Sequence, residues 1–135
     1  MIPIGAANFV VVSIMGVNNL TYTETHPITR PEADSAFTSN DPHLICVALV
    51  NLAFHEPEWR WVQDRCVEFA VHPDPNIRGL AAACLGHLAR IHGQLDLDKV
   101  TPLLQQLLLD QEVLVRGRTQ DAIADIKIYM KCEVS

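Results

Sequence analysis

Two aspartate–proline pairs, Asp41-Pro42 and Asp74-Pro75, each stand directly before a long run of mostly apolar residues. An aspartate side chain accepts hydrogen bonds from the free amide groups at a helix start, and proline at the first helical position has no amide hydrogen to leave unpaired. The pairs therefore predict two helix starts, 33 residues apart. Because the sequence after residue 40 does not alternate apolar and polar residues as a strand would, we expect helices to build the body of the chain.

Capping residues, prolines and a glycine mark the other predicted helix boundaries. Residues 29–32 combine a capping threonine, an early proline and a glutamate three residues after the cap. Pro57 opens another helix, Gly93 suits the left-handed residue that ends one, and Asp96 or Asp98 caps the next. Apolar residues recur at intervals of three and four between these signals. Helices are predicted at about residues 29–39, 42–54, 57–69, 75–93, 96–108 and 112–130.

Short stretches of the sequence also repeat. Residues 41–45 align with residues 74–78, and the Ile-Arg-Gly of residues 77–79 aligns with the Val-Arg-Gly of residues 115–117, which is 38 residues further on. Periods of about 33 to 47 residues are typical of proteins built from repeated helical pairs.

The segment DPNIRGLAAACLG, residues 74–86, resembles the first helix of a HEAT repeat, and residues 112–118 are similar to a weaker copy of it. The resemblance covers about residues 40–130. It implies an all-α fold, a short right-handed α-solenoid of about two and a half HEAT-like helical hairpins. Arg78 and Arg116 occupy the repeat's arginine position, where the side chain is expected to pair with an acid of a neighbouring repeat.

The chain is predicted to divide into an irregular or strand-like N-terminal arm, residues 1–28, and a HEAT-like helical domain, residues 29–135. The apolar start of the arm lacks the basic region and cleavage site of a secretory signal and is too short to span a bilayer. The four cysteines are widely and unequally spaced without a CxxC pair, so free thiols are expected. These features favour a cytoplasmic protein without metal or cofactor.

The net charge of the chain favours some kinds of binding partner over others. Sixteen acidic and ten basic residues give a formal net charge of −6, which repels the phosphate backbone of nucleic acid. The same charge favours encounter with a basic protein, because complementary long-range charge raises association rates. We therefore expect a protein partner, no direct contact with nucleic acid or membrane, and a monomer before binding.

The chain is also similar to small bacterial HEAT-like proteins that serve as immunity proteins for toxic nucleases in contact-dependent inhibition and related polymorphic toxin systems. This resemblance implies a module that neutralises a cognate nuclease toxin by stoichiometric binding and occlusion of its active site. One alternative is a HEAT-like adaptor or assembly factor for another enzyme. A second alternative is a small helical lyase or hydrolase.

The predicted partner-contacting residues begin with an acidic ridge. Asp64 and Glu68 stand four residues apart on one helix, a spacing at which like charges repel. Arg60 and Arg65 could neutralise them in part. If the ridge instead receives lysines or arginines of a toxin, Trp61 would serve as its apolar anchor. The full predicted set is Glu56, Trp61, Asp64, Glu68, His87, Asp121 and Asp125.

The sequence has few motifs that would indicate catalysis or metal binding. His55-Glu56 begins like a zinc-protease motif, but Trp59 stands where the second histidine should be. Asp121 and Asp125 share a helical face, as paired carboxylates in acid–base chemistry do, and the lyase or hydrolase alternative would combine them with His87. Arg118, three residues before Asp121, supports a solvated charge network as the simpler interpretation. No catalytic residue is predicted, and the chain is expected not to be an enzyme.

Overall fold

The computed structural model describes residues 9–13 and 20–131 of the chain. Within these residues the helical fold class predicted from the sequence is confirmed, and two short strands precede the helices. The helices are α2 (Arg30–Thr38), α3 (Pro42–His55), α4 (Trp59–Phe69), α5 (Pro75–His92), α6 (Leu97–Leu107) and α7 (Val113–Met130). In the described part of the chain, no helix has the length and apolar character needed to cross a membrane.

The predicted helix caps at both aspartate–proline pairs are confirmed. The Asp41 carboxylate accepts a hydrogen bond from the amide of His43 at 2.9 Å, and the Asp74 carboxylate accepts one from the amide of Asn76 at 2.8 Å. Gly93 ends α5 in the left-handed conformation, with φ of 64°, which a residue without a Cβ atom adopts at little cost. Local sequence chemistry therefore determines where α3 starts and where α5 starts and ends.

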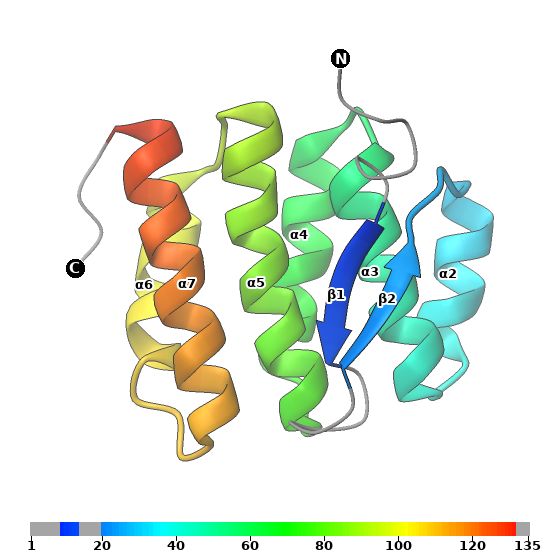
Figure 1. Cartoon of the computed structure of the whole chain (residues 1–135), viewed down its shortest axis with the longest axis horizontal. Helices are drawn as coiled ribbons and strands as arrows, with labels where there is room; N and C mark the ends of the chain where they lie inside the picture. The colour runs from blue at the N-terminus through cyan, green and yellow to red at the C-terminus, as the bar shows by residue number, and fades with distance from the viewer. Residues whose placement is uncertain (1–8, 14–19, 132–135) are drawn as a thin grey trace.

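The helices are arranged in two layers. In Figure 1, α3, α5 and α7 form a row facing the viewer, while α4 and α6 lie behind this row and α2 lies beside α3. Consecutive helices thus form the pairs α2–α3, α4–α5 and α6–α7. Because α2 has only nine residues, the first pair is shorter than the other two.

Helices α5 and α7 pack unusually closely, through two glycines of α5. A Cβ atom built on Gly79 would lie 2.9 Å from Cδ of Arg118. One built on Gly86 would lie 2.9 Å from Cα of Ala122. A larger residue at Gly86 would therefore collide with the backbone of α7, whereas at Gly79 it would meet a flexible side chain.

An ion pair joins the first turn of α5 to the turn before α7. The Arg78 guanidinium donates two hydrogen bonds to the Asp110 carboxylate, from Nε at 3.0 Å and from Nη2 at 2.9 Å. Its Nη1 donates to the carbonyl of Pro73 at 2.9 Å. Arg116 donates from Nη1 to the carbonyl of Asp110 at 2.6 Å. Arg78 therefore pairs with a carboxylate, as expected from the sequence, whereas Arg116 binds the backbone carbonyl of the same aspartate.

Three cysteines lie in the core between α3, α4 and α5. Cys46, Cys66 and Cys84 are buried free thiols. Burial raises the pKa of Cys46 to about 12. A hydrogen bond with Cys66, together with burial, holds the pKa of Cys84 well above its ordinary value. These three cysteines therefore pack as small apolar side chains. The fourth, Cys132, lies outside the described residues.

The predicted arm includes two strands. β1 (Phe9–Ser13) pairs antiparallel with β2 (Leu20–Glu24), and the pair is drawn in front of the helical row in Figure 1. Immediately after β2, the Thr25 hydroxyl hydrogen-bonds Nε2 of His55 at 2.9 Å, and the His26 amide donates to Oδ1 of Asn51 at 3.0 Å. These bonds hold the end of the arm against α3. Residues 1–8 and 14–19 of the arm lie outside the described residues, and its division from the helices at residue 28 stays a prediction.

Candidate protein interface

The seven residues predicted to contact a partner do not form one surface. One group belongs to α4 and the turn before it, and the other belongs to the row of α5 and α7. The first group is Glu56, Trp61, Asp64 and Glu68, and the second is His87, Asp121 and Asp125.

Glu56 and Trp61 both make contacts inside the chain. The Glu56 carboxylate accepts a hydrogen bond from the amide of Glu58 at 2.9 Å, immediately before α4 begins. The Trp61 ring is half-buried against the core and has two guanidinium groups near it, that of Arg30 at 4.5 Å and that of Arg65 at 5.7 Å from the ring centre. These cation–π contacts occupy part of the ring that a partner would use as an anchor. Trp59, the other tryptophan of α4, is also half-buried against the core.

The acidic ridge of α4 is partly neutralised, by Arg65 as expected and by Lys99 in place of Arg60. Nζ of Lys99, on α6, lies 3.7 Å from the Asp64 carboxylate, and Nε of Arg65 lies 3.6 Å from the Glu68 carboxylate. Arg60, which was expected to help, stacks on Trp59 instead. Exposed ion pairs of this kind contribute between about 0 and 1 kcal/mol, so Asp64 and Glu68 can exchange these partners for others at small cost.

His87 is held as a neutral side chain. Its ring packs against that of Phe54 with 5.0 Å between centroids and 48° between the ring planes, and its Nδ1 accepts a hydrogen bond from Nη2 of Arg90 at 2.7 Å. Burial, with the positive charges of Arg90 and Arg118 as smaller causes, lowers the pKa of His87 to about 4. Because Nδ1 is engaged by Arg90, the geometry gives no support to a pairing of His87 with Asp121 or Asp125 for catalysis.

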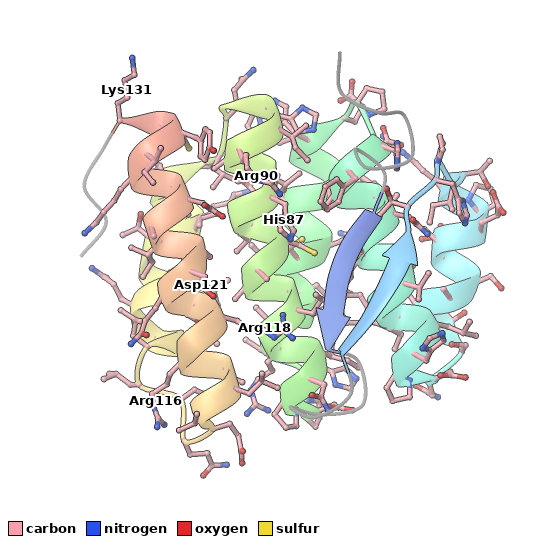
Figure 2. The ribbon with its side chains drawn as sticks, viewed as in Figure 1. His87, Arg90, Arg116, Arg118, Asp121 and Lys131 are labelled. Atoms are coloured by element: carbon pink, nitrogen blue, oxygen red, sulfur yellow. The ribbon has the colours of Figure 1, made fainter. Side chains whose placement is uncertain are left out.

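The two aspartates of α7 differ in environment. Figure 2 shows Asp121 on the front of α7, to the left of Arg118 and His87 in this view, and Asp121 is exposed. Asp125 is half-buried beside α5, with its Oδ2 3.2 Å from the position of a Cβ atom built on Gly86. Asp121 is therefore the more accessible of the two to another protein. In the described residues, no three histidine, cysteine, aspartate or glutamate side chains are grouped so that they could hold a metal ion.

One surface of α7 was not predicted from the sequence. A pocket of about 410 Å³ lies along the first two turns of this helix, lined by Val113, Leu114, Gly117, Arg118, Gln120 and Asp121. Val113 is 70% exposed, and further along the helix Ile128 is 64% exposed. The signal in the sequence was that apolar residues occur all around α7 rather than on one stripe. An exposed apolar floor with a polar rim is the usual composition of a protein-binding surface.

The chain is similar to a protein of known structure. A chain in the crystal structure of a CDI complex from Cupriavidus taiwanensis LMG 19424 superimposes with a TM-score of 0.71 and is 32% identical in sequence. The alignment covers 82% of this chain and 98% of the matched chain. No protein-family model and no curated protein matches the sequence.

Proposed function

The chain belongs to the same family as the protein that it matches in the CDI complex, and on this premise we propose that it is an immunity protein of a contact-dependent inhibition system. In this role it binds a cognate toxin domain in the cytoplasm, one molecule to one molecule, and blocks the toxin's active site. The observation that carries the proposal is the match itself, because it extends over 98% of the matched chain at 32% identity.

The surface chemistry supports binding of a basic partner. The formal net charge is −6, and in the described residues the ridge carboxylates form ion pairs with the exposed Lys99 and the half-buried Arg65. A toxin that binds nucleic acid presents lysines and arginines around its active site, because these neutralise phosphates. An acidic binding protein is attracted to such a surface, so a nuclease is the toxin class that fits this charge.

Steric occlusion is the mechanism that the fold supports. The helices are joined by short turns and held by the Arg78–Asp110 pair and the glycine contacts between α5 and α7, so they present a preformed surface. A preformed surface loses little conformational freedom on binding, which favours affinity. Inhibition by this route needs binding alone and no chemical turnover.

Co-expression tests this proposal. The reading frame immediately upstream of the gene for this chain is expressed in a bacterial host from an inducible promoter, with and without the chain. If the proposal is correct, induction of the upstream product alone stops growth and co-expression of the chain restores it. The proposal is wrong if the upstream product is toxic and the chain gives no protection. Binding to a non-toxic neighbouring enzyme would favour the adaptor role instead.

A further inference from the structure

Among the described helices, α4 is the one whose ends have neither a favourable charge nor a side-chain cap. A helix is stabilised by acidic residues in its first turn, by basic residues in its last turn and by a capping side chain at its start. Every other described helix has at least one of these features, whereas α4 has none of them. Places where a sequence breaks such local rules are expected to be functional.

The charges on α4 are placed against the helix dipole. Arg60 stands in the first turn, near the positive end of the dipole, and Glu68 stands in the last turn, near the negative end. Asp64 lies between them at steps of four residues, so the three side chains share the outer side of the helix. This order of charges costs stability, and the fold itself therefore does not explain it.

Two exposed arginines are each stacked on a tryptophan of α4. The guanidinium of Arg60 lies 4.7 Å from the ring centre of Trp59, and that of Arg30, the first residue of α2, lies 4.5 Å from the ring centre of Trp61. Within the described residues, neither guanidinium forms an ion pair or a hydrogen bond. Stacking engages the flat face of a guanidinium and leaves the N–H groups at its edge directed outward. Both arginines are therefore held in a state that suits a planar carboxylate.

The acidic residues nearest to these arginines along the chain have other partners. The carboxylates of Glu32 and Glu56 accept hydrogen bonds from backbone amides beside the starts of α2 and α4, each at 2.9 Å. Asp64, four residues after Arg60, lies 3.7 Å from Lys99 instead. The positive charge of the two stacked arginines is thus not paired with any carboxylate of the described chain.

The outer side of α4 fits a partner that carries both signs of charge. In Figure 1, α4 lies behind the row of α3 and α5, whereas the described strands of the arm lie in front of this row. Arg60 and Glu68 are exposed, and at about 1.5 Å per residue they are separated by about 12 Å along the helix. A complementary surface has carboxylates opposite the arginines and basic side chains opposite Asp64 and Glu68, in that order.

We infer that the outer side of α4 docks the toxin, with carboxylates of the toxin bound by Arg30 and Arg60 and basic side chains of the toxin bound by Asp64 and Glu68. The inference rests on the proposed function, because it takes the toxin as the partner. It adds that the toxin presents acidic groups beside its basic ones, and that the order of the charges fixes the direction in which the toxin lies along α4.

Charge reversal tests the two arginines. Arg30→Glu and Arg60→Glu are made separately, and Lys131→Glu, an exposed change at the end of α7, is the control with the same change in net charge. The probe is the purified toxin domain encoded immediately upstream. Each arginine variant is expected to bind it at least about tenfold more weakly than wild type, and the control should stay within about twofold. When acidic residues of the toxin are replaced by lysine one at a time, one replacement should restore binding to an arginine variant.

Thermal unfolding separates a role in binding from a role in folding. Arg60→Glu removes a cation from the first turn of α4, so its thermal midpoint is expected not to fall although its binding weakens. A midpoint that falls together with binding would show that Arg60 serves the fold and would overturn the inference.

Equal binding by wild type and both arginine variants would overturn the inference and leave the proposed function intact. If the wild-type chain itself binds no upstream product, the proposed function fails and the inference fails with it. A wild-type chain that sediments as a dimer, with monomeric Arg60→Glu, would assign this surface to a second copy. RNA that binds to wild type and not to the arginine variants would assign the arginines to nucleic acid. Either of these two results would overturn the toxin as the occupant.

Discussion

Gly86 of α5 lies so close to α7 that a Cβ atom on it would be 2.9 Å from the Cα atom of Ala122. Gly117 of α7, by contrast, has open space around it in the described structure. We expect Gly86→Ala to lower the free energy of unfolding by about 1–3 kcal/mol, because the added methyl group forces the helices apart. Gly117→Ala should raise it by about 1 kcal/mol, because alanine favours the helix more than glycine does. Urea unfolding of the two variants measures both changes. Equal effects at the two positions would contradict the close packing of α5 on α7.

The Arg78–Asp110 pair joins α5 to the turn before α7, and we expect it to weaken in acid. Both side chains are nearly buried, with 14% and 13% of their surface exposed. Asp110→Asn should lower the free energy of unfolding at pH 7 by about 1.5–3 kcal/mol, the range for hydrogen bonds to charged groups. Glu112→Gln, an exposed change two residues away, is the control and should have a small effect.

The pH dependence of this pair has a definite sign. Hydrogen bonds from Arg78 hold the pKa of Asp110 below its ordinary value of 3.8. The carboxylate therefore stabilises the fold above the unfolded-state pKa, and this stabilisation is lost as pH falls through the lower, folded-state pKa. The difference between wild type and Asp110→Asn should shrink below about pH 4. A difference that stays constant down to pH 2 would show that the ion pair is not its cause.

His87 should make the protein sensitive to milder acid. Its pKa falls from 6.5 to about 4 in the fold, mainly because the ring is buried. A group whose pKa is lowered on folding favours the native state above its unfolded-state pKa, and stability declines as pH drops from 6.5 toward 4. His87→Gln cannot take up this proton, so its thermal midpoint should change less between pH 7 and pH 5 than that of wild type. Parallel curves for the two proteins would show that His87 titrates normally.

The acidic ridge is expected to act on the rate of association. Asp64→Lys combined with Glu68→Lys should slow binding of the upstream-encoded toxin domain several-fold at low salt, because the attraction to a basic surface is lost. Stability should change by less than about 1 kcal/mol, since both ion pairs are exposed. Stopped-flow mixing at two ionic strengths measures the rates, and Asp34→Lys on α2 is compared with Asp64→Lys as a matched single reversal. Equal rates for these two single variants would exclude the ridge from the approach of the toxin.

Most of the helical fold could be predicted because its boundaries depend on local chemistry. Asp41, Asp74 and Gly93 act through hydrogen bonds and backbone angles within a few residues, so their roles can be recognised in sequence alone. The start of α4 was less well predicted, since helix geometry begins at Trp59 rather than at Pro57. The aspartate that pairs with Arg78 lies 32 residues away, and only the packed structure identifies it.

The candidate site was harder to predict because it depends on which side of each helix is covered. The sequence shows that Asp64 and Glu68 share a face, but Lys99, which neutralises Asp64, comes from another helix. The open space at the Cβ position of Gly117 likewise depends on which helices pack beside α7, whereas the same residue type at Gly79 is buried against Arg118. The repeat offset of 38 residues, visible in the sequence, becomes informative only once the contacts of α5 are known.

Direct titration of the purified chain with the purified toxin domain encoded upstream is the measurement that tests the central claim most closely. Isothermal calorimetry gives both stoichiometry and affinity, and a toxin activity assay on the same mixture shows whether binding inhibits. An immunity protein should form a one-to-one complex with a Kd below about 1 µM and abolish toxin activity at equimolar ratio. No detectable binding, or binding that leaves the toxin fully active, would contradict the proposal that this chain neutralises its toxin by occupying the active site.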